Sequence, residues 1–312
     1  MIEIAVKING DHWINPEAVE QQLQQVPKNS KVMIDMNTEG ASMRALGITD
    51  MIDRYLAPKQ VYVRAWANGV EVIPYHRPET HLWSHFFWLA KRYWHAELLP
   101  VTHEKLFGCF IGRATWPRMR MLTDLRREMA ERCLFSLMGL AHVPLPVGRN
   151  LDPREKWFDS DTDPRATLGD ITSLDGHTIR DQYNPIHNTN LSLLAHYHRF
   201  DIEIVSETYC YGDAYLPTEK TIRPLLFGKP LLIYGPKYFL KRLRDQGFHT
   251  WHDHWNEDYD NLEGPARWQS MLEQIRMISR NDQVNLMLDD CQTISDHNRR
   301  HARAIGTTHA AQ

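Results

Sequence analysis

Hydrophobic residues follow two different periods along this chain, and the two alternate. Short apolar runs rich in β-branched residues predict buried strands, whereas apolar residues three or four positions apart predict amphipathic helices. The predicted strands are the runs MIEIAVKI, KVMIDM, QVYVRAW, VEVIPY, KLFGCFIG, DIEIV and LLIYG. Strands that alternate with helices predict parallel βαβ units, so we expect an α/β fold.

Helices are expected in most of the segments between those strands. They are predicted over residues 16–25, 50–55, 81–95, 117–138, 190–198, 219–227, 236–247 and 264–286, and a further one is predicted to start within 41–46. The helix over 117–138 is followed by Gly139, which is a natural helix stop. The tail from about Asp296 is polar and rich in His and Arg, and we expect it to be frayed.

Residues 201–247 contain the clearest signals for where helices begin and end. It is predicted to form a strand, a loop, a helix, a second strand and a second helix. Thr218 is placed to cap the first helix, and Glu219 in its first turn complements the helix dipole. Gly228 and Pro230 end that helix. Because ligands of parallel sheets bind where strands end and helices begin, we look for chemistry at this loop.

The length of 312 residues suggests two domains. We place the boundary just before the KLFGCFIG strand, which gives domains over residues 1–104 and 105–290 and a polar tail over 291–312. The region 143–185 is loop-rich, and within it the residues LDPREKWFDSDTDPRATLGD could form a flap or an acceptor-side insertion. The helix over 264–286 could cross back to the first domain.

Composition narrows the class of protein. Hydrophobic residues make up 42% and charged residues 24%, as in ordinary globular proteins, and the net charge of −3 argues against a strongly basic nucleic-acid surface. The four cysteines form no CxxC pair, so we expect reduced thiols in a cytoplasmic protein. We expect neither a signal peptide nor a membrane span, because no basic start precedes an apolar stretch and no apolar run approaches 18 residues.

Aromatic and imidazole side chains are abundant, with ten Trp, twelve Tyr and seventeen His. Such side chains suit stacking on sugars and recognition of polyols. Compositional bias together with an aromatic core is the alternative interpretation, and the sequence leaves both open.

The residues SETYCYGDAYLPTEK, followed by a helix, GKP and an apolar strand, resemble a known family. They are similar to the donor-binding region of nucleotide-sugar glycosyltransferases of the two-Rossmann-domain (GT-B) type, in particular the α1,3-fucosyltransferase group. That group has roughly Phe-Glu-Asn-Ser, a Gly/Tyr loop and then Val-Thr-Glu-Lys. The resemblance covers the C-terminal half. It departs from the pattern at Ser206-Glu207-Thr208 and in a slightly longer loop.

The resemblance implies two Rossmann-like domains that face across a cleft, with the donor bound to the second. It assigns Arg118 and Lys220, each at a predicted helix start, to the donor phosphates, and Glu219 to the ribose hydroxyls. Surface salt bridges are the structural alternative for the two cations. Complementing the helix dipole is the alternative for Glu219.

Other residues of the same loop are candidates for the donor site. Glu207 could bind sugar hydroxyls or position the loop, and Tyr209 and Tyr211 could stack on the base or the sugar. Thr218 belongs to the donor-binding motif.

Inverting glycosyl transfer needs a base that takes the acceptor proton. We expect it in the first domain, at the loop after KVMIDM, where Glu39 is the first candidate and Asp35 the second. Glu79 is a further candidate. A turn or helix-capping role is the alternative for each of these carboxylates.

No metal site is expected. His252 and His254 would share one face of a strand, but two histidines without a third ligand are a weak signal. The motif Asp159-Ser160-Asp161 does not follow an apolar strand.

The sequence thus predicts a glycosyltransferase that is inverting, independent of metal and without a cofactor, with the nucleotide sugar as its substrate. The acceptor would be a glycan, a lipid-linked sugar, or a hydroxylated base in DNA if the protein is viral. A non-catalytic carbohydrate- or nucleotide-binding protein is the alternative. A phosphate-binding hydrolase or kinase is disfavoured, because no Gly-rich phosphate loop is present.

Overall fold

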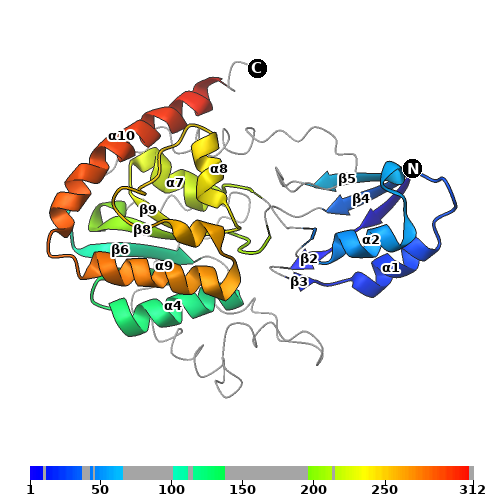
Figure 1. The fold of residues 1–312 in the computed structure, drawn as a ribbon, viewed down its shortest axis with the longest axis horizontal. Coiled ribbons are helices and arrows are strands. Elements are labelled where there is room, and N and C mark those ends of the chain that lie inside the picture. The colour runs from blue at the N-terminus through cyan, green and yellow to red at the C-terminus, as the bar shows by residue number, and fades with distance from the viewer. Residues whose placement is uncertain are drawn as a thin grey trace.

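The computed structural model describes residues 1–9, 12–36, 43–44, 46–65, 101–111, 115–137, 196–212 and 215–308. In these residues the fold is α/β, with two parallel sheets and one short antiparallel ribbon (Figure 1). The α/β class with parallel strands, expected from the alternating periods, is therefore confirmed. Both sheets are compatible with a Rossmann-like arrangement.

The first sheet is built from N-terminal strands. Its order is β1 (Ile2–Ala5), β4 (Val32–Met36) and β5 (Val61–Ala65), all parallel. The ribbon β2 (Ile8–Asn9) and β3 (His12–Trp13) leads to helix α1 (Pro16–Gln24), and α2 (Ile48–Tyr55) contacts α1. A 3₁₀ turn over Pro58–Gln60 precedes β5. The predicted strands KVMIDM and QVYVRAW and the helix from Pro16 are thereby confirmed.

The second sheet has the order β7-β6-β8-β9, and all its strands are parallel. They are β6 (Lys105–Ile111), β7 (Cys133–Leu137), β8 (Phe200–Ser206) and β9 (Leu231–Tyr234). The helices are α4 (Trp116–Met129), α7 (Glu219–Phe227), α8 (Phe239–Asp245), α9 (Gly264–Ser279) and α10 (Val284–Thr308), with 3₁₀ turns at Tyr197–Arg199 and Asp258–Asn261. Helices α4 and α9 cover one face, and α7, α8 and α10 the other (Figure 1).

One glycine is required by the close packing of β6 on β8. A Cβ atom at Gly108 would lie 2.8 Å from the ring of Phe200, the first residue of β8. A larger residue at position 108 would force the Phe200 ring to move, so glycine permits the close packing of the two strands here.

Each sheet has its own hydrophobic core. The larger cluster surrounds β6, β8 and β9 and includes Trp251 and Trp268, and the smaller one surrounds β4 and α2. One residue crosses this division. Tyr209, in the loop after β8, is 8% exposed and belongs to the smaller cluster with Met36 and Met43. The loop that was expected to carry ligand-binding residues is therefore anchored in the core of the first sheet.

The prediction of one long helix over residues 117–138 is wrong. Helix α4 ends at Met129, and Cys133–Leu137 forms β7, which pairs in parallel with β6. The residues CLFSL continue the helical spacing of apolar positions, which is why periodicity assigned them to the helix. These residues form a strand instead, on the side of β6 opposite β8. The strand position is favoured because it buries four consecutive residues from Cys133 in the sheet.

The C-terminal predictions also need correction. The helix expected over 264–286 ends at Ser279, where the Asn281 side chain accepts a 2.9 Å hydrogen bond from the Gln283 amide. The tail expected to be frayed is α10, whose buried Cys291 and Ala302 face the core. Among the described elements, α9 contacts α4 and β9, and α10 contacts α7.

Three polar side chains form a closed network inside the second core. Arg223 Nη2 donates to Glu203 Oε1 at 2.6 Å, and its Nε donates to the Tyr197 hydroxyl at 2.5 Å. The Tyr197 hydroxyl in turn donates to Glu203 Oε2. Both charged side chains are at most 3% exposed. The network links helix α7 to strand β8, in addition to the loop that joins them.

We expect Arg223→Met to lower the free energy of unfolding by about 3–5 kcal/mol, because Glu203 would remain as an uncompensated buried charge. The double variant Arg223→Met/Glu203→Leu should recover much of that loss. Urea denaturation measures both. Equal losses in the single and double variants would show that the ion pair does not explain the effect.

Lys229 is a further buried cation, 5% exposed, that donates to the carbonyl of Phe200. Burial lowers the pKa of its ammonium to about 8, although Asp201 and Glu203 act in the opposite direction. Between pH 8 and 10.5 the unfolded chain then binds more protons than the folded one. The contribution of Lys229 to stability therefore rises with pH in this window.

The matched variant is Lys229→Met. We expect the stability of wild type relative to this variant to increase by roughly 3 kcal/mol as the pH rises through that window. Urea midpoints measured at intervals of half a pH unit follow the difference. A difference that stays constant with pH would contradict a lowered pKa.

Candidate functional site

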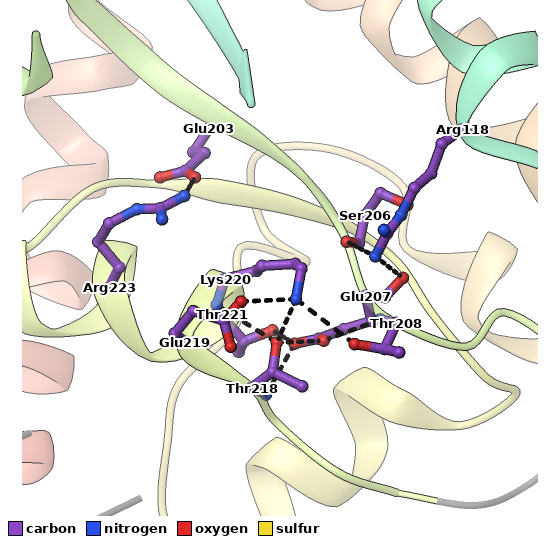
Figure 2. A network of polar contacts seen from close by, with 10 residues as sticks. All are labelled: Arg118, Glu203, Ser206, Glu207, Thr208, Thr218, Glu219, Lys220, Thr221 and Arg223. Carbon is purple, nitrogen blue, oxygen red and sulfur yellow. Dashed lines mark hydrogen bonds and ion pairs between the residues drawn. The ribbon is translucent and has the colours of Figure 1, made fainter. Parts of the chain in front are cut away.

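The candidate site lies where β8 ends and α7 begins. This is the carboxyl edge of the second parallel sheet, the place where such sheets bind ligands. Figure 2 shows that Arg118, Glu207, Thr218, Glu219 and Lys220 come together here. The sequence had placed all five at this edge, and the structure confirms that placement.

Glu207 connects the two sides of the loop through its carboxylate. The residue is 3% exposed. Its Oε1 accepts from the Thr218 amide at 3.0 Å and from the Thr221 hydroxyl, and its Oε2 accepts from the Thr218 hydroxyl at 2.6 Å and the Thr208 amide at 3.2 Å. A carboxylate offers about four acceptor positions, and these bonds occupy all of them. Of its two predicted roles, Glu207 therefore performs loop positioning here.

Thr218 is the N-cap of α7, as the sequence predicted. Its Oγ1 accepts a 3.3 Å bond from the Lys220 amide, while its hydroxyl hydrogen goes to Glu207. The residue is 1% exposed. The cap and the carboxylate together fix the position at which the first turn of α7 starts.

Glu219 and Lys220 form that first turn and reach the surface. Lys220 Nζ donates to Glu219 Oε1 at 2.7 Å, to Thr218 Oγ1 at 3.2 Å and to Thr208 Oγ1 at 3.4 Å. Their side chains are 17% (Lys220) and 22% (Glu219) exposed. Burial alone would raise the pKa of the Glu219 carboxyl, but the charge and hydrogen bond of Lys220 bring it below its usual value. The site thus presents an ionised carboxylate beside an ammonium, at a helix N-terminus.

Arg118 reaches the site from the first turn of α4. It is 4% exposed, and its Nη2 donates to the carbonyls of Ser206 at 3.2 Å and Glu207 at 2.8 Å. Its Nε donates to the Ser206 hydroxyl at 3.3 Å. The guanidinium is therefore directed at the end of β8, where it fixes the backbone that carries Glu207. This arrangement adds a positioning role to the predicted phosphate contact.

The two tyrosines of the loop have different surroundings. Tyr209 packs into the core of the first sheet, so its ring is not placed to stack on a ligand. Tyr211 is half-buried, and its Cε1 would lie 3.0 Å from a Cβ atom at Gly264, the first residue of α9. Tyr211 remains a candidate for ligand contact, and Gly264 leaves the space that its ring occupies.

Of the three candidates for a catalytic base, the structure describes one. Asp35 lies near the carboxyl end of β4, in register with Ala5 and Arg64. Glu39 and Glu79 lie outside the described residues. The position of Asp35 fits the predicted edge of the first sheet.

In the part of the chain that the structure describes, no three His, Cys, Asp or Glu side chains are grouped as metal ligands. His252 and His254 belong to a turn, with the His254 amide bonded to the Trp251 carbonyl at 2.9 Å, so the strand geometry assumed for the pair is wrong. Asp159 and Asp161 lie outside the described residues.

Three residues of the site were not found from the sequence. Thr208, Ser206 and Thr221 complete the network around Glu207, Lys220 and Arg118. Their hydroxyls carry no signal in a single sequence, because a buried threonine beside a carboxylate looks like any other threonine in a helix or loop. Only the folded arrangement identifies them.

Comparisons with known proteins give no further guide. The sequence matches no protein-family model, and no curated protein or solved structure matches it. None of the described helices is long and apolar enough to cross a membrane.

We expect Glu207→Gln to lower the free energy of unfolding by about 2–4 kcal/mol, because the amide group cannot accept all four hydrogen bonds and places a donor against other donors. Glu219→Gln is the matched control at the same loop, and its partly exposed ion pair should contribute at most about 1 kcal/mol. Urea denaturation of the two variants gives the comparison. Similar losses in both would contradict the clamping role of Glu207.

Proposed function

We propose that the protein is a glycosyltransferase that moves a sugar from a nucleotide-sugar donor to a hydroxyl acceptor, on two Rossmann-like domains of the GT-B type. One observation carries the proposal. An ionised Glu219 and a neighbouring Lys220 reach the surface at the N-terminus of α7, and a buried carboxylate holds that helix start in place. These are the groups that a nucleoside diphosphate needs, and they lie at a ligand-binding edge of the fold.

The donor would use the charged pair by separating it. The Glu219 carboxylate would accept hydrogen bonds from both ribose hydroxyls, each contributing about 1.5–3 kcal/mol. The Lys220 ammonium and the positive end of the α7 dipole would hold the diphosphate, because a helix N-terminus and a cation both favour an anion. Arg118 would keep the end of β8 in register and contribute to the phosphates through its guanidinium.

The reaction would be a displacement at the anomeric carbon. A bond forms between the acceptor oxygen and that carbon, and the bond to the diphosphate breaks, so that the nucleoside diphosphate leaves with the electron pair. The acceptor proton passes to a carboxylate of the first sheet, for which Glu39 and Asp35 are the candidates. Such a transfer would invert the anomeric centre and would need no metal, since Lys220 and the N-terminal end of the α7 dipole would neutralise the leaving group.

A non-catalytic nucleotide- or carbohydrate-binding protein is the second candidate. It is favoured by the state of Lys220, whose three ammonium donors are all directed at neighbouring side chains. A protein that only binds a nucleoside would use Glu219 and leave that arrangement unchanged. The two candidates differ in one respect, because only a transferase consumes the nucleotide sugar.

The test is calorimetry with UDP, GDP, ADP, CDP and TDP on wild type and on Glu219→Ala. We expect one of the five to bind, and Glu219→Ala to weaken it by about a hundredfold through the loss of two hydrogen bonds. Asp50→Ala is the matched control, because Asp50 likewise occupies the first turn of a helix, α2. Its affinity should equal that of wild type.

Binding of none of these nucleotides, or equal affinities of wild type and Glu219→Ala, would contradict the proposal. A nucleoside diphosphate that binds through Glu219, while its sugar conjugate is neither transferred nor hydrolysed, would support the non-catalytic candidate instead.

A further inference from the structure

Three stacked histidines attach the C-terminal half of α10 to the segment that follows α8. The rings of His249 and His297 stack with their centroids 3.8 Å apart and an angle of 12° between their planes. The rings of His297 and His301 follow at 5.9 Å and 17°. His297 and His301 belong to α10, whereas His249 lies in the segment after α8. We call these three residues the histidine row, and none of them takes part in the proposed function.

Both histidines of α10 are hydrogen-bonded to the backbone of that segment. His297 Nε2 lies 3.0 Å from the Gly247 carbonyl oxygen, and His301 Nε2 lies 2.7 Å from the Gln246 carbonyl oxygen. A carbonyl oxygen only accepts, so each Nε2 carries a hydrogen and donates it. In the neutral rings Nδ1 is then the atom that takes up a proton. Protonation therefore leaves these two bonds intact and acts through the charge that it adds.

Further contacts fix the register of α10 on the same segment. The Asn298 carboxamide accepts a hydrogen bond from the His249 amide at 2.8 Å and donates one to the His249 carbonyl at 2.8 Å. The His301 ring meets the Phe248 ring edge to face, with centroids 4.7 Å apart. Gly247 leaves space for the imidazole, because a Cβ atom there would lie 2.9 Å from His301 Nε2.

Apolar packing adds little over this half of the helix. Among the described residues after Cys291, the apolar side chain that is fully buried is that of Ala302, and Ile305 is half-buried. The burial of one methyl group stabilises far less than the burial of a leucine or phenylalanine side chain. The polar contacts of the histidine row and of Asn298 therefore have a large share in keeping residues 295–305 docked.

Charged groups on the packed elements do little to offset a proton on the row. Asp296 of α10 pairs with Arg299 at 2.8 Å, and Asp245 of α8 pairs with Lys241 at 2.8 Å. The other charged or titratable groups are His252, Asp253, His254 and the pair Arg244–Glu257 after and on α8, Arg242 on α8, Arg300 and Arg303 on α10, and Glu219, Lys220, Arg223 and Lys229 on or after α7.

The surroundings lower the pKa of His249. Partial removal from water is the main cause, and the charges of His297, His301 and His252 act in the same direction. Once released, the segment has histidines with the ordinary pKa of about 6.5, so below that pH it binds more protons than the docked form does. The docked form is therefore favoured above pH 6.5 and loses this advantage as the pH falls.

From this geometry we propose that residues 295–305 of α10 form a proton-sensitive latch, which releases from the segment 246–249 when the histidine row is protonated. Release is favoured because the stacked rings of His249 and His297 would become like charges at a centroid distance of 3.8 Å.

Release of the latch would uncover part of α7. Helix α10 packs on α7, on the face of the sheet that also carries α8 (Figure 1). The contact lies at the C-terminal end of α7, where a Cβ atom at Gly228 would be 3.6 Å from the Ser295 carbonyl oxygen. The candidate site is at the other end of the same helix. The latch does not require glycosyl transfer there and holds equally for a non-catalytic protein.

The experiment is hydrogen exchange followed by mass spectrometry on the full chain at pH 7.5 and pH 5.5, with rates corrected for the intrinsic effect of pH. We expect the opening of residues 295–305 to increase about threefold at the lower pH, because the row takes up a proton on release. Peptides from α9 should keep their protection, which separates release of the latch from acid unfolding of the whole chain.

The variant His249→Phe isolates the titration. Phenylalanine keeps a ring that can stack on His297 and keeps the backbone bonds to Asn298, but it takes up no proton. The ratio of opening at the two pH values should therefore fall to about one. His252→Phe is the matched control on the same segment, because the His252 side chain is 59% exposed and lies outside the row. It should keep the pH response of wild type.

Asn298→Ala tests the attachment apart from the titration. It removes both bonds to the His249 backbone, so the latch should open more at both pH values while the ratio between them stays that of wild type.

The proposal is overturned if the corrected exchange of residues 295–305 is equal at the two pH values, or if His249→Phe keeps the wild-type response. Equal acceleration in α9 would identify acid unfolding of the whole chain and also overturn it. No nucleotide enters the experiment, so its outcome is independent of the proposed donor site.

Discussion

The buried carboxylate of Glu207 is the interaction on which the rest of the site depends. Moving a carboxylate out of water costs several kcal/mol, and the structure offsets this with four hydrogen bonds from two backbone amides and two threonine hydroxyls. Those donors come from both ends of one loop. The carboxylate therefore closes the loop and determines where α7 begins, which in turn places Glu219 and Lys220 at the edge of the sheet.

Neighbouring interactions hold the loop between β8 and α7 in place. Arg118 fixes the carbonyls of Ser206 and Glu207, so the end of β8 cannot shift relative to α4. The buried pair of Glu203 and Arg223 ties α7 to β8 one turn further on. Tyr209 extends the same loop into the core of the first sheet, which links the candidate site to the half of the protein that is proposed to carry the base.

Much of this was accessible from the sequence, and what was missed has a common cause. Apolar runs predicted the strands other than β7, and the Thr218 cap predicted the start of α7, because these signals are local. Residues 133–137 were assigned to a helix and the C-terminal residues to a frayed tail, because pairing with β6 and packing on α7 are decided by distant residues. Arg118 and Glu207 were placed correctly at the edge of the sheet by local signals. Their hydrogen bond was not predicted, because it joins residues that are distant in the sequence.

The most direct test of this account is a crystal structure of the protein with the nucleoside diphosphate that binds it most tightly. The account predicts the ribose hydroxyls on Glu219, the diphosphate at the first turn of α7 beside Lys220, and the bonds of Glu207 unchanged. A nucleotide bound elsewhere, or a Glu207 carboxylate that leaves Thr218 to contact the ligand, would contradict it.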